Sequence, residues 1–277
     1  MDLRASFEKL LGRTPTPSVA VLRLQGPIGV GGRRGLSIER LAPALERAFG
    51  MTGISAVALV INSPGGSPAQ SALIGARIRA LAEEKKLPVY AYVEDVAASG
   101  GYWLACAADE IVADANSIVG SIGVIAASFG FEDLMRRLGV RRRLYTAGTR
   151  KSLLDPFGPE KPEDVERLRA LQDEIHANFR DWVQARRGTR LTGDPETLFT
   201  GEFWTGTRAR ALGLVDALGD ARSDLRRRFG EKVRFRGVPV AGRSLRSLLG
   251  LRHGGDGWPE DLVDSLETRA LWARYGL

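Results

Sequence analysis

Cysteine and histidine are nearly missing from this chain. Among its 277 residues there is one cysteine, Cys106, and there are two histidines, His176 and His253. A single cysteine cannot form an internal disulfide, and it gives no sign of an oxidising compartment. So few thiol and imidazole groups argue against a zinc site and leave few bases for a Ser-His-Asp triad. We therefore expect no metal, no cofactor and a cytoplasmic location.

Long apolar runs are also missing. No stretch of about 18 apolar residues occurs, so no membrane-spanning helix is expected. The first 13 residues lack the apolar core of a signal peptide. The hydrophobic fraction of 44% and the charged fraction of 26% are those of a soluble globular protein, and the length suffices for one large or two small domains.

Lysine is scarce although the chain is basic. Only 6 of the 40 basic residues are lysine, which leaves 34 arginines, and the net charge is +7. Arginines cluster within residues 136–143 and 226–228. We interpret these clusters as solvated surface and expect no nucleic-acid partner, because no nucleic-acid motif accompanies them. Peripheral contact with a membrane surface stays open as an alternative.

The apolar pattern predicts an α/β fold. Strands are predicted over residues 19–24, 54–61, 88–93, 111–113 and 122–125. Helices are predicted over residues 38–48, 68–84, 101–107, 131–138, 163–187 and 259–275. This alternation favours a parallel sheet built from repeated strand–helix units and flanked by helices. We divide the chain into an N-terminal helical segment (1–17), a central domain (18–220) and a C-terminal tail with a terminal helix (221–277).

The most informative position is Ser99, in the sequence ASGGYW at 98–103. A serine on a glycine-rich turn after a buried strand is placed to attack a bound carbonyl group. A second turn of this kind, NSPGG at 62–66, follows the preceding predicted strand. Because glycine lets a backbone amide approach a substrate closely, Gly66 and Gly100 are the candidate oxyanion donors.

Lys151 is the candidate base for this serine. A serine hydroxyl needs a base to take its proton, and a lysine can do so only when it is neutral. Burial lowers the pKa of a lysine from its reference value of about 10.4, and reaching about 7 costs roughly 4 kcal/mol. The neighbouring residues Leu153, Leu154 and Phe157 could supply apolar surroundings. We expect the Ser121 hydroxyl to orient the amine.

Each motif alone is common, and their order carries the information. The ordered set is NSPGG at 62–66, ASGGY at 98–102, AAD at 107–109, GSIGV at 120–124, Lys151-Ser152 with Pro156-Phe157, FWTG at 203–206 and GLVDALG at 213–219. This set resembles the signal peptide peptidase A family of serine peptidases over about residues 18 to 220. The resemblance implies that Ser99 is the nucleophile, that Lys151 is the general base held by Ser121, and that Gly66 supplies an oxyanion amide.

The resemblance also implies a fold, an assembly and a substrate. The fold is of the Clp-protease and crotonase type. The assembly is a homo-oligomeric ring or dome, in which adjacent subunits supply the serine and the lysine. The substrate is an extended, largely apolar peptide, such as a signal-peptide fragment, cleaved through an acyl-enzyme. The chain departs from this family in showing no N-terminal membrane anchor and no family motif after residue 220.

Two other functions fit parts of the pattern. A crotonase-like acyl-CoA enzyme would use the same oxyanion turns, but it would typically rely on carboxylates and would bind CoA thioesters. A non-catalytic scaffold of the family would keep the fold and use the arginine clusters to bind a membrane or a protein partner. Labelling of Ser99 by a serine-directed covalent probe distinguishes the peptidase from both alternatives.

Overall fold

The computed structural model describes residues 16–29, 35–148, 150–240 and 269–277. The chain forms two compact units. The larger unit consists of Met1–Ile122 together with Arg180–Leu277, and the smaller unit is Gly123–Phe179. Each unit is described by itself below.

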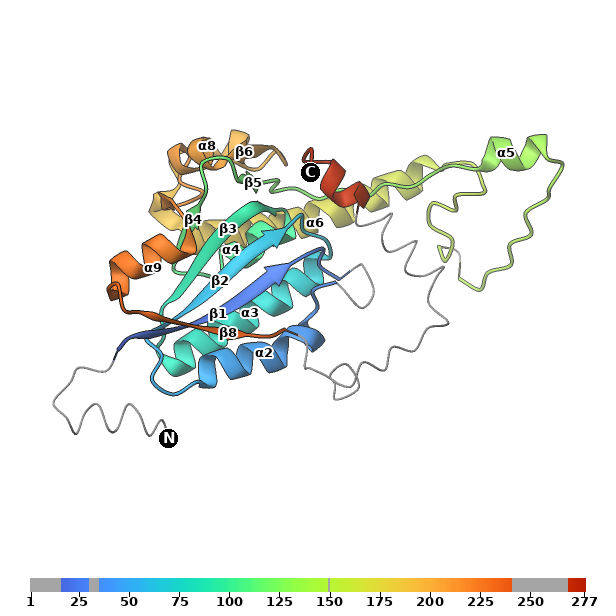
Figure 1. The fold of residues 1–277 in the computed structure, drawn as a ribbon. Coiled ribbons are helices and arrows are strands. Elements are labelled where there is room, and N and C mark those ends of the chain that lie inside the picture. The colour runs from blue at the N-terminus through green and yellow to red at the C-terminus, as the bar shows by residue number, and fades with distance from the viewer. Residues whose placement is uncertain (1–15, 30–34, 149, 241–268) are drawn as a thin grey trace. The chain divides into compact units, whose positions relative to one another are not determined.

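Eight strands in the described part of the larger unit form one sheet. Their bounds are β1 Ser18–Gln25, β2 Ala56–Ser63, β3 Val89–Ala98, β4 Glu110–Ala113, β5 Ile118–Gly120, β6 Phe203–Thr205, β7 Ala217–Leu218 and β8 Arg234–Val238. The order is β6-β5-β3-β2-β1-β8, while β4 pairs with β3 and with β7 (Figure 1). Every pair is parallel except β5 with β6. This architecture, a mostly parallel sheet flanked by helices, is the α/β class that the sequence predicted.

The long strand β3 pairs with two strands in succession. Residues 90–93 pair with β4, and residues 96–98 pair with β5. The register against β2 shifts between Ile61 and Ser63, where two residues of β2 advance against four of β3. Such a bulge bends a strand and re-aims its end. The carboxyl end of β3 is thereby directed along β5, and Ser99 follows it directly.

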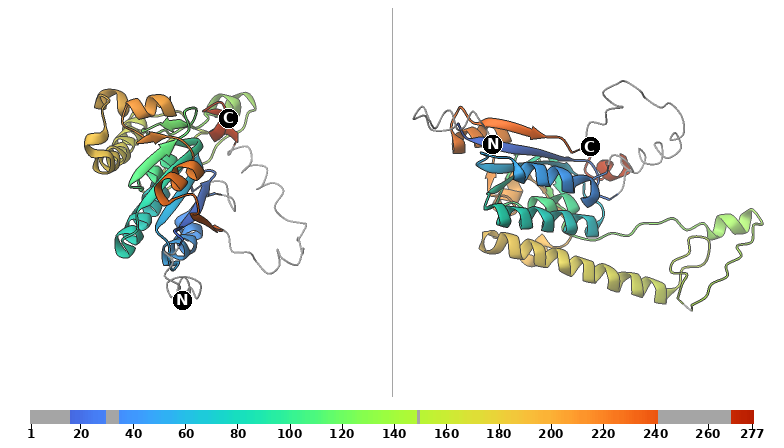
Figure 2. Two further views of the ribbon diagram at one scale, coloured as in Figure 1. Left: turned by 60° about the vertical axis from the view of Figure 1, so that its left-hand side comes forward. Right: turned by 90° about the horizontal axis from the view of Figure 1, so that it is seen from below.

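Helices cover both faces of the sheet (Figures 1 and 2). On one face, α2 (Ile38–Gly50) and α3 (Pro68–Lys85) pack against each other, and the Ser37 and Ser67 side chains cap their first turns. On the other face, α9 (Ala221–Phe229) places Leu225 in a cluster that includes Val19 and Tyr92. Strand β2, with helices on both faces, is buried along all eight residues.

Shorter helices join these strands. They are α4 Gly100–Ala105, the 3-10 turn Gly188–Arg190, α7 Pro195–Leu198 and α8 Gly206–Ala211. The long helix α6 spans Pro162–Arg187, close to the predicted 163–187. Its Arg187 side chain is buried in the larger unit and binds Asp216 at 2.7 Å.

The smaller unit contains the helix α5 (Glu132–Arg137) and an aromatic cluster. The Phe131 and Phe157 rings stack with their centroids 5.6 Å apart. Arg142 lies over the Phe157 ring and pairs with Asp155 at 3.0 Å. Many large apolar side chains of this unit are nevertheless exposed. They are Ile125, Phe129, Phe131, Leu134, Leu138, Val140, Leu144, Tyr145, Phe157 and Leu171.

Two parts of the chain differ from the sequence-based expectation. The strand expected at 122–125 is wrong, because β5 ends at Gly120 and the backbone turns there with φ of +116° at Gly120 and +54° at Ser121. The segment expected to be a separate tail after residue 220 contributes α9 and β8, and β8 pairs with β1. The expected N-terminal helix and most of the terminal helix lie outside the described residues.

Candidate active site

Ser99 lies at the junction of β3 and α4, in a backbone conformation that serine seldom adopts. Its φ is +53° and its ψ is −123°. The Ser99 amide donates to Gly120 O at 2.8 Å, and Trp103 N donates to Ser99 O at 3.0 Å. The hydroxyl does not cap the following helix, and the residue is half-buried. A non-glycine residue held at positive φ stores strain of about 1–3 kcal/mol, and such residues cluster at functional sites.

The turn after β2 packs directly against this junction. A Cβ atom added to Gly65, whose φ is +95°, would lie 2.7 Å from Ser99 Cβ. A Cβ atom added to Gly66 would lie 2.1 Å from Ile28 O, in backbone that is already paired through Ser67 N. Only glycine fits these two positions, because any side chain would displace backbone.

The two predicted oxyanion donors lie close together. A Cβ atom added to Gly100 would lie 3.4 Å from Gly66 N. Gly100 N is in the first turn of α4, where an amide has no partner within its own helix. Within the described residues, neither amide donates to a backbone or side-chain acceptor. Two amides without a protein acceptor, in the turns that adjoin the half-buried Ser99, form the kind of arrangement that can stabilise an oxyanion.

Ser121 lies beside Ser99 at the same end of the sheet. Ala98 and Gly120 are register partners in β3 and β5, so the residues that follow them are neighbours. Ser121 has a φ of +54°, is half-buried and is anchored by its amide, which donates to Glu202 O at 2.7 Å. The structure therefore brings together four of the five predicted site residues: Ser99, Ser121, Gly66 and Gly100.

Lys151, the fifth, belongs to the smaller unit. It is exposed, and its amide donates to Gly148 O at 3.2 Å. Nearby Leu153 and Leu154 are half-buried, whereas Phe157 is exposed. Within the smaller unit, the surroundings of Lys151 thus do not provide the apolar shielding that a neutral lysine requires.

Sequence analysis missed the role of Asn62 in fixing the bulge of β3. Its Nδ2 donates to Asp95 Oδ2 at 2.6 Å, and its Oδ1 accepts from Val96 N at 3.3 Å. It also missed Ser71, which lies beneath Gly100 and donates to Ser67 O at 2.9 Å. The only available signal was that Asn62 begins the NSPGG turn directly after an apolar run.

The described residues of the larger unit include no histidine. His176 lies half-buried in the part of α6 that belongs to the smaller unit, and His253 lies outside the described residues. The described ranges hold no cluster of three or more acidic, histidine or cysteine side chains that could bind a metal ion. Cys106 is buried, and burial raises its pKa to about 12, so this thiol is inert as a nucleophile near neutral pH.

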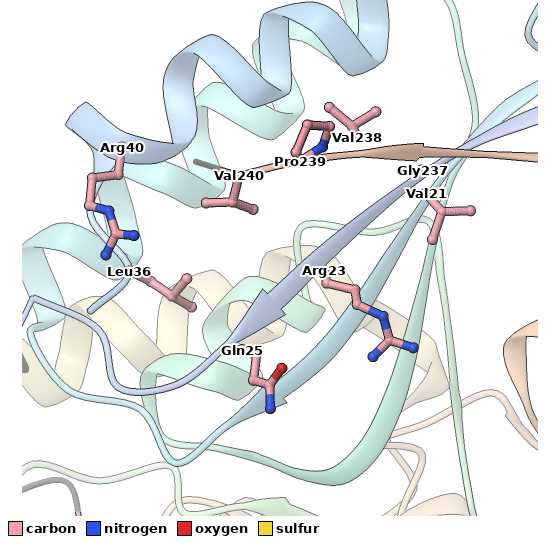
Figure 3. A pocket seen from close by; sticks show the side chains of 9 residues that line it. All are labelled: Val21, Arg23, Gln25, Leu36, Arg40, Gly237, Val238, Pro239 and Val240. Carbon is pink, nitrogen blue, oxygen red and sulfur yellow. The ribbon is translucent and has the colours of Figure 1, made fainter. Parts of the chain in front are cut away.

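An open pocket lies beside β1 and β8 (Figure 3). It has a volume of about 560 Å³ and is lined by Val21, Arg23, Gln25, Leu36, Arg40, Gly237, Val238, Pro239 and Val240. Its two guanidinium groups are already engaged, because Arg23 pairs with Glu94 at 2.9 Å and Arg40 donates to Gly35 O at 2.6 Å. None of the predicted site residues lines it.

Among the helices in the described ranges, none is long and apolar enough to cross a membrane.

A family model described as Peptidase family S49 matches residues 81–232, more than half of the chain. The match includes Ser99, Ser121 and Lys151 but not the turn at 62–66. A solved structure of a mutant of the 1510-N membrane-bound stomatin-specific protease aligns with a TM-score of 0.48 and 14% sequence identity, over 82% of this chain and 99% of that one.

Three curated relatives align with most of this chain. A protein of Brucella abortus (strain 2308) named Na(+)/H(+) antiporter NhaA is 51% identical over 282 residues, covering 96% of this chain and 38% of the relative. The chloroplastic serine protease SPPA of Arabidopsis thaliana is 34% identical, covering 72% of this chain and 29% of the relative. Protease 4 of Haemophilus influenzae is 32% identical, covering 73% and 32%. The chain therefore spans well under half the length of each of these relatives.

Proposed function

Because this chain belongs to peptidase family S49, we propose that it is a serine peptidase with Ser99 as its nucleophile and Lys151 as its general base. The observation that supports this most directly is the backbone of Ser99. The residue is held at a φ of +53° between β3 and α4, directly before Gly100, and it packs against Gly65, the neighbour of Gly66. A strained, half-buried serine next to two free amides has no evident structural use.

The proposed reaction starts when the Lys151 amine takes the proton of Ser99 Oγ. The oxygen then attacks the peptide carbonyl carbon, and the resulting oxyanion accepts hydrogen bonds from Gly66 N and Gly100 N. The C–N bond breaks as the lysine ammonium returns its proton to the leaving amine, which produces an ester on Ser99. A water molecule, deprotonated by the same lysine, hydrolyses this ester and releases the acid product.

The Ser121 hydroxyl is the proposed partner of the lysine amine. Its place next to Ser99 follows from the pairing of β3 with β5, and its anchored backbone limits its motion. A hydroxyl can accept a hydrogen bond from an ammonium and donate one to a neutral amine, so it can orient lysine in both states of the cycle.

We propose that the active peptidase is a homo-oligomer. Lys151 is exposed in the single chain, and a second subunit would provide the water-excluding surface that a neutral lysine needs. The smaller unit also exposes Phe129 at 79%, Tyr145 at 89% and Leu138 at 66%. Large exposed apolar side chains gathered in one unit are typical of interaction surfaces. A ring in which neighbouring subunits complete each other's site agrees with both observations.

The proposed substrate is an extended, largely apolar peptide. Phe203 in β6 is 42% exposed. Its register partner in β5 is Gly120, the residue directly before Ser121. An aromatic ring at this place offers apolar contact to a peptide side chain bound across the site. Trp204, which follows it, is buried and holds β6 in place.

Peptide cleavage by three full-length variants tests this proposal. Ser99→Ala and Lys151→Ala should each lower kcat/KM for a fluorogenic apolar peptide by at least about a thousandfold, because each removes a group that the chemical step requires. Lys151→Arg should be equally inactive, since an arginine side chain stays charged. Wild-type turnover in any of the three variants would contradict the proposal.

Covalent labelling separates the peptidase from the alternative functions. A fluorophosphonate should modify wild-type Ser99, identified by mass spectrometry of the labelled peptide, and should leave Ser99→Ala unmodified. A crotonase-like enzyme would instead turn over acyl-CoA thioesters without this label, and a scaffold would do neither. Lysine-dependent labelling, weaker in Lys151→Ala, is expected only of the peptidase.

A further inference from the structure

The described end of the chain, residues 269–277, reaches the candidate site. The Tyr275 hydroxyl donates to Pro64 O at 3.4 Å and to Ser121 Oγ at 3.3 Å. The Tyr275 ring meets the Phe203 ring edge-on, with centroids 5.2 Å apart and planes at 75°. We call the three contacted residues Pro64, Ser121 and Phe203 the tyrosine subsite, and residues 269–277 the C-terminal segment.

These three residues come from three different parts of the sheet edge. Pro64 belongs to the turn that carries the oxyanion glycine Gly66, while Ser121 follows β5 and Phe203 begins β6. A single side chain therefore contacts two of the glycine-rich turns that flank Ser99. These two turns also carry Gly66 and adjoin Ser99, so the side chain lies next to the residues that we propose to act on a peptide.

The C-terminal segment has a defined structure of its own. It is helical over residues 269–273, and the helix ends in a Schellman motif. In this motif Leu277 N donates to Trp272 O at 3.3 Å, Gly276 N donates to Ala273 O at 3.2 Å, and Gly276 takes the required positive φ of +75°. Gly276 thus permits the turn that ends the helix beside Tyr275.

One face of this segment is turned to the protein. Leu271, Trp272 and Tyr275 are half-buried, whereas the residues between and around them are exposed. The spacing i, i+1, i+4 is that of one side of a helix. Tyr275 therefore belongs to the less exposed side of the segment, and its side chain makes the contact with the tyrosine subsite.

We propose that the tyrosine subsite is a binding site for the chain's own C-terminal segment, which competes there with peptide substrate. This inference rests on the proposed function for its consequence, because the competition matters only if Ser99 acts on peptides. The segment is bound as a closed helix and turn, while peptidase substrates are bound extended, so it occupies the site without presenting a cleavable bond.

The contacts predict weak, reversible occupation. One hydroxyl proton is shared between two acceptors at 3.3 and 3.4 Å, which are long distances for an O–H donor. An aromatic pair and one such hydrogen bond together account for about a three- to tenfold effect on an equilibrium constant. Substrate at high concentration should therefore displace the segment, so the effect belongs to KM and leaves kcat unchanged.

Three variants of the full chain test the competition through peptide kinetics. Tyr275→Ala should lower the KM for the fluorogenic peptide about three- to tenfold with kcat unchanged. Tyr275→Phe, which keeps the ring contact with Phe203, should have a smaller effect. Arg274→Ala is the matched control, because Arg274 is an exposed neighbour without a role in the contact, and its KM should equal that of the wild type.

Binding of the segment in trans gives a readout that does not depend on catalysis. A fluorescein-labelled peptide with the sequence of residues 269–277 should bind Ser99→Ala/Tyr275→Ala protein, as measured by fluorescence anisotropy. The same peptide with alanine in place of its tyrosine should bind at least about threefold more weakly. Substitution Phe203→Ala in the protein should weaken binding of the tyrosine peptide by a similar factor.

The outcomes separate this inference from the proposed function. Absence of peptide turnover in the wild type would contradict the proposed function, yet tyrosine-dependent anisotropy would still support the binding site. An unchanged KM in Tyr275→Ala, or equal binding of the two peptides, would overturn the inference while leaving the peptidase intact. Loss of the C-terminal residues from the wild type, but not from Ser99→Ala, would show the segment to be a substrate and would overturn it as well.

Discussion

Asn62 donates a hydrogen bond of 2.6 Å from Nδ2 to Asp95 Oδ2, across the bulge that divides β3 into its two halves. The same side chain accepts from Val96 N at 3.3 Å, and the Asn62 backbone carbonyl accepts from Gly26 N at 2.9 Å. The side chain and the backbone carbonyl of this one buried residue therefore tie the ends of β1, β2 and the bulged β3 together. Ser99 lies only three residues after Val96 in the chain.

We predict that Asn62→Ala loosens this junction. Val96 N would lose its acceptor in a buried place, which costs about 1–3 kcal/mol in the free energy of unfolding. Urea denaturation should show this loss, and fluorophosphonate labelling of Ser99 should slow in the folded variant. Asp95→Asn keeps an acceptor for the Asn62 amide and should resemble the wild type. An Asn62→Ala variant with wild-type stability would show that the hydrogen bonds do not fix the bulge.

A second prediction concerns the close packing beneath Gly100. Its added Cβ would lie 2.3 Å from Ser71 Oγ and 3.2 Å from Ile28 Cδ1, so Gly100→Ala should destabilise the fold by about 1–3 kcal/mol. The combination with Ser71→Ala removes the nearer obstacle and should recover part of this loss. Gly237→Ala is the control, because a Cβ there meets nothing within 4 Å. Equal urea midpoints for both single variants would refute the packing argument.

The pair formed by Arg187 and Asp216 stabilises the larger unit from inside. Burial alone would raise the pKa of Asp216, but hydrogen bonds from Arg187 and from Ile111 N outweigh it and leave this pKa below its usual range. The Arg187 Nη1 and Nη2 atoms lie 2.7 and 3.0 Å from the two carboxylate oxygens, and Arg187 is only 3% exposed. A carboxyl group whose pKa is lowered on folding contributes stability above its unfolded pKa of about 3.9, and this contribution is lost as the pH falls through the lowered value.

We therefore predict that Asp216→Asn costs about 3–5 kcal/mol at pH 7, because it leaves a buried guanidinium without a counter-charge. Thermal unfolding followed from pH 7 to pH 2 should show the Tm of the wild type falling below about pH 4 more steeply than that of Asp216→Asn. Glu46→Gln is the control, since Glu46 pairs with Arg77 at the surface with a side-chain exposure of 58%. Parallel pH profiles of the wild type and Asp216→Asn would contradict the assignment.

The site edge could be predicted from the sequence because its elements follow local rules. Residues 54–61 form an uninterrupted apolar run, and the structure buries β2 completely. Glycines at 65, 66 and 100 indicate turns where the backbone is closely approached. In the structure, a side chain at any of these positions would collide with backbone or with Ser71. Because parallel strands bring their carboxyl ends to one edge, two separate glycine turns could be expected to meet.

The parts that could not be predicted depend on long-range partners. β8 has the sequence RFRGV, whose arginines hide the strand signal, and it is a strand because β1 offers it an edge. Asn62 carries no pattern that distinguishes it from any polar residue at a strand end. Tyr275 meets Ser121 across 154 residues of sequence, and no local rule anticipates such a contact.

The origin of the two catalytic groups can be settled by mixing two inactive proteins. If neighbouring subunits supply Ser99 and Lys151, coexpressed Ser99→Ala and Lys151→Ala chains should form some sites with both groups intact. Random assembly of equal amounts in a closed ring gives about a quarter of the wild-type activity per site. If one chain supplies both groups, no mixed assembly contains a complete site, and activity stays absent.

The control for this mixture pairs Ser99→Ala with the double variant Ser99→Ala/Lys151→Ala, which cannot restore a nucleophile and should remain inactive. Native mass spectrometry must show both chains in the same assembly, since failure to mix would otherwise imitate the negative result. Lys151 is exposed, and under this proposal a neighbouring subunit shields it and makes it a usable base. We therefore expect restored activity to coincide with the oligomeric fraction and to vanish when dilution dissociates it.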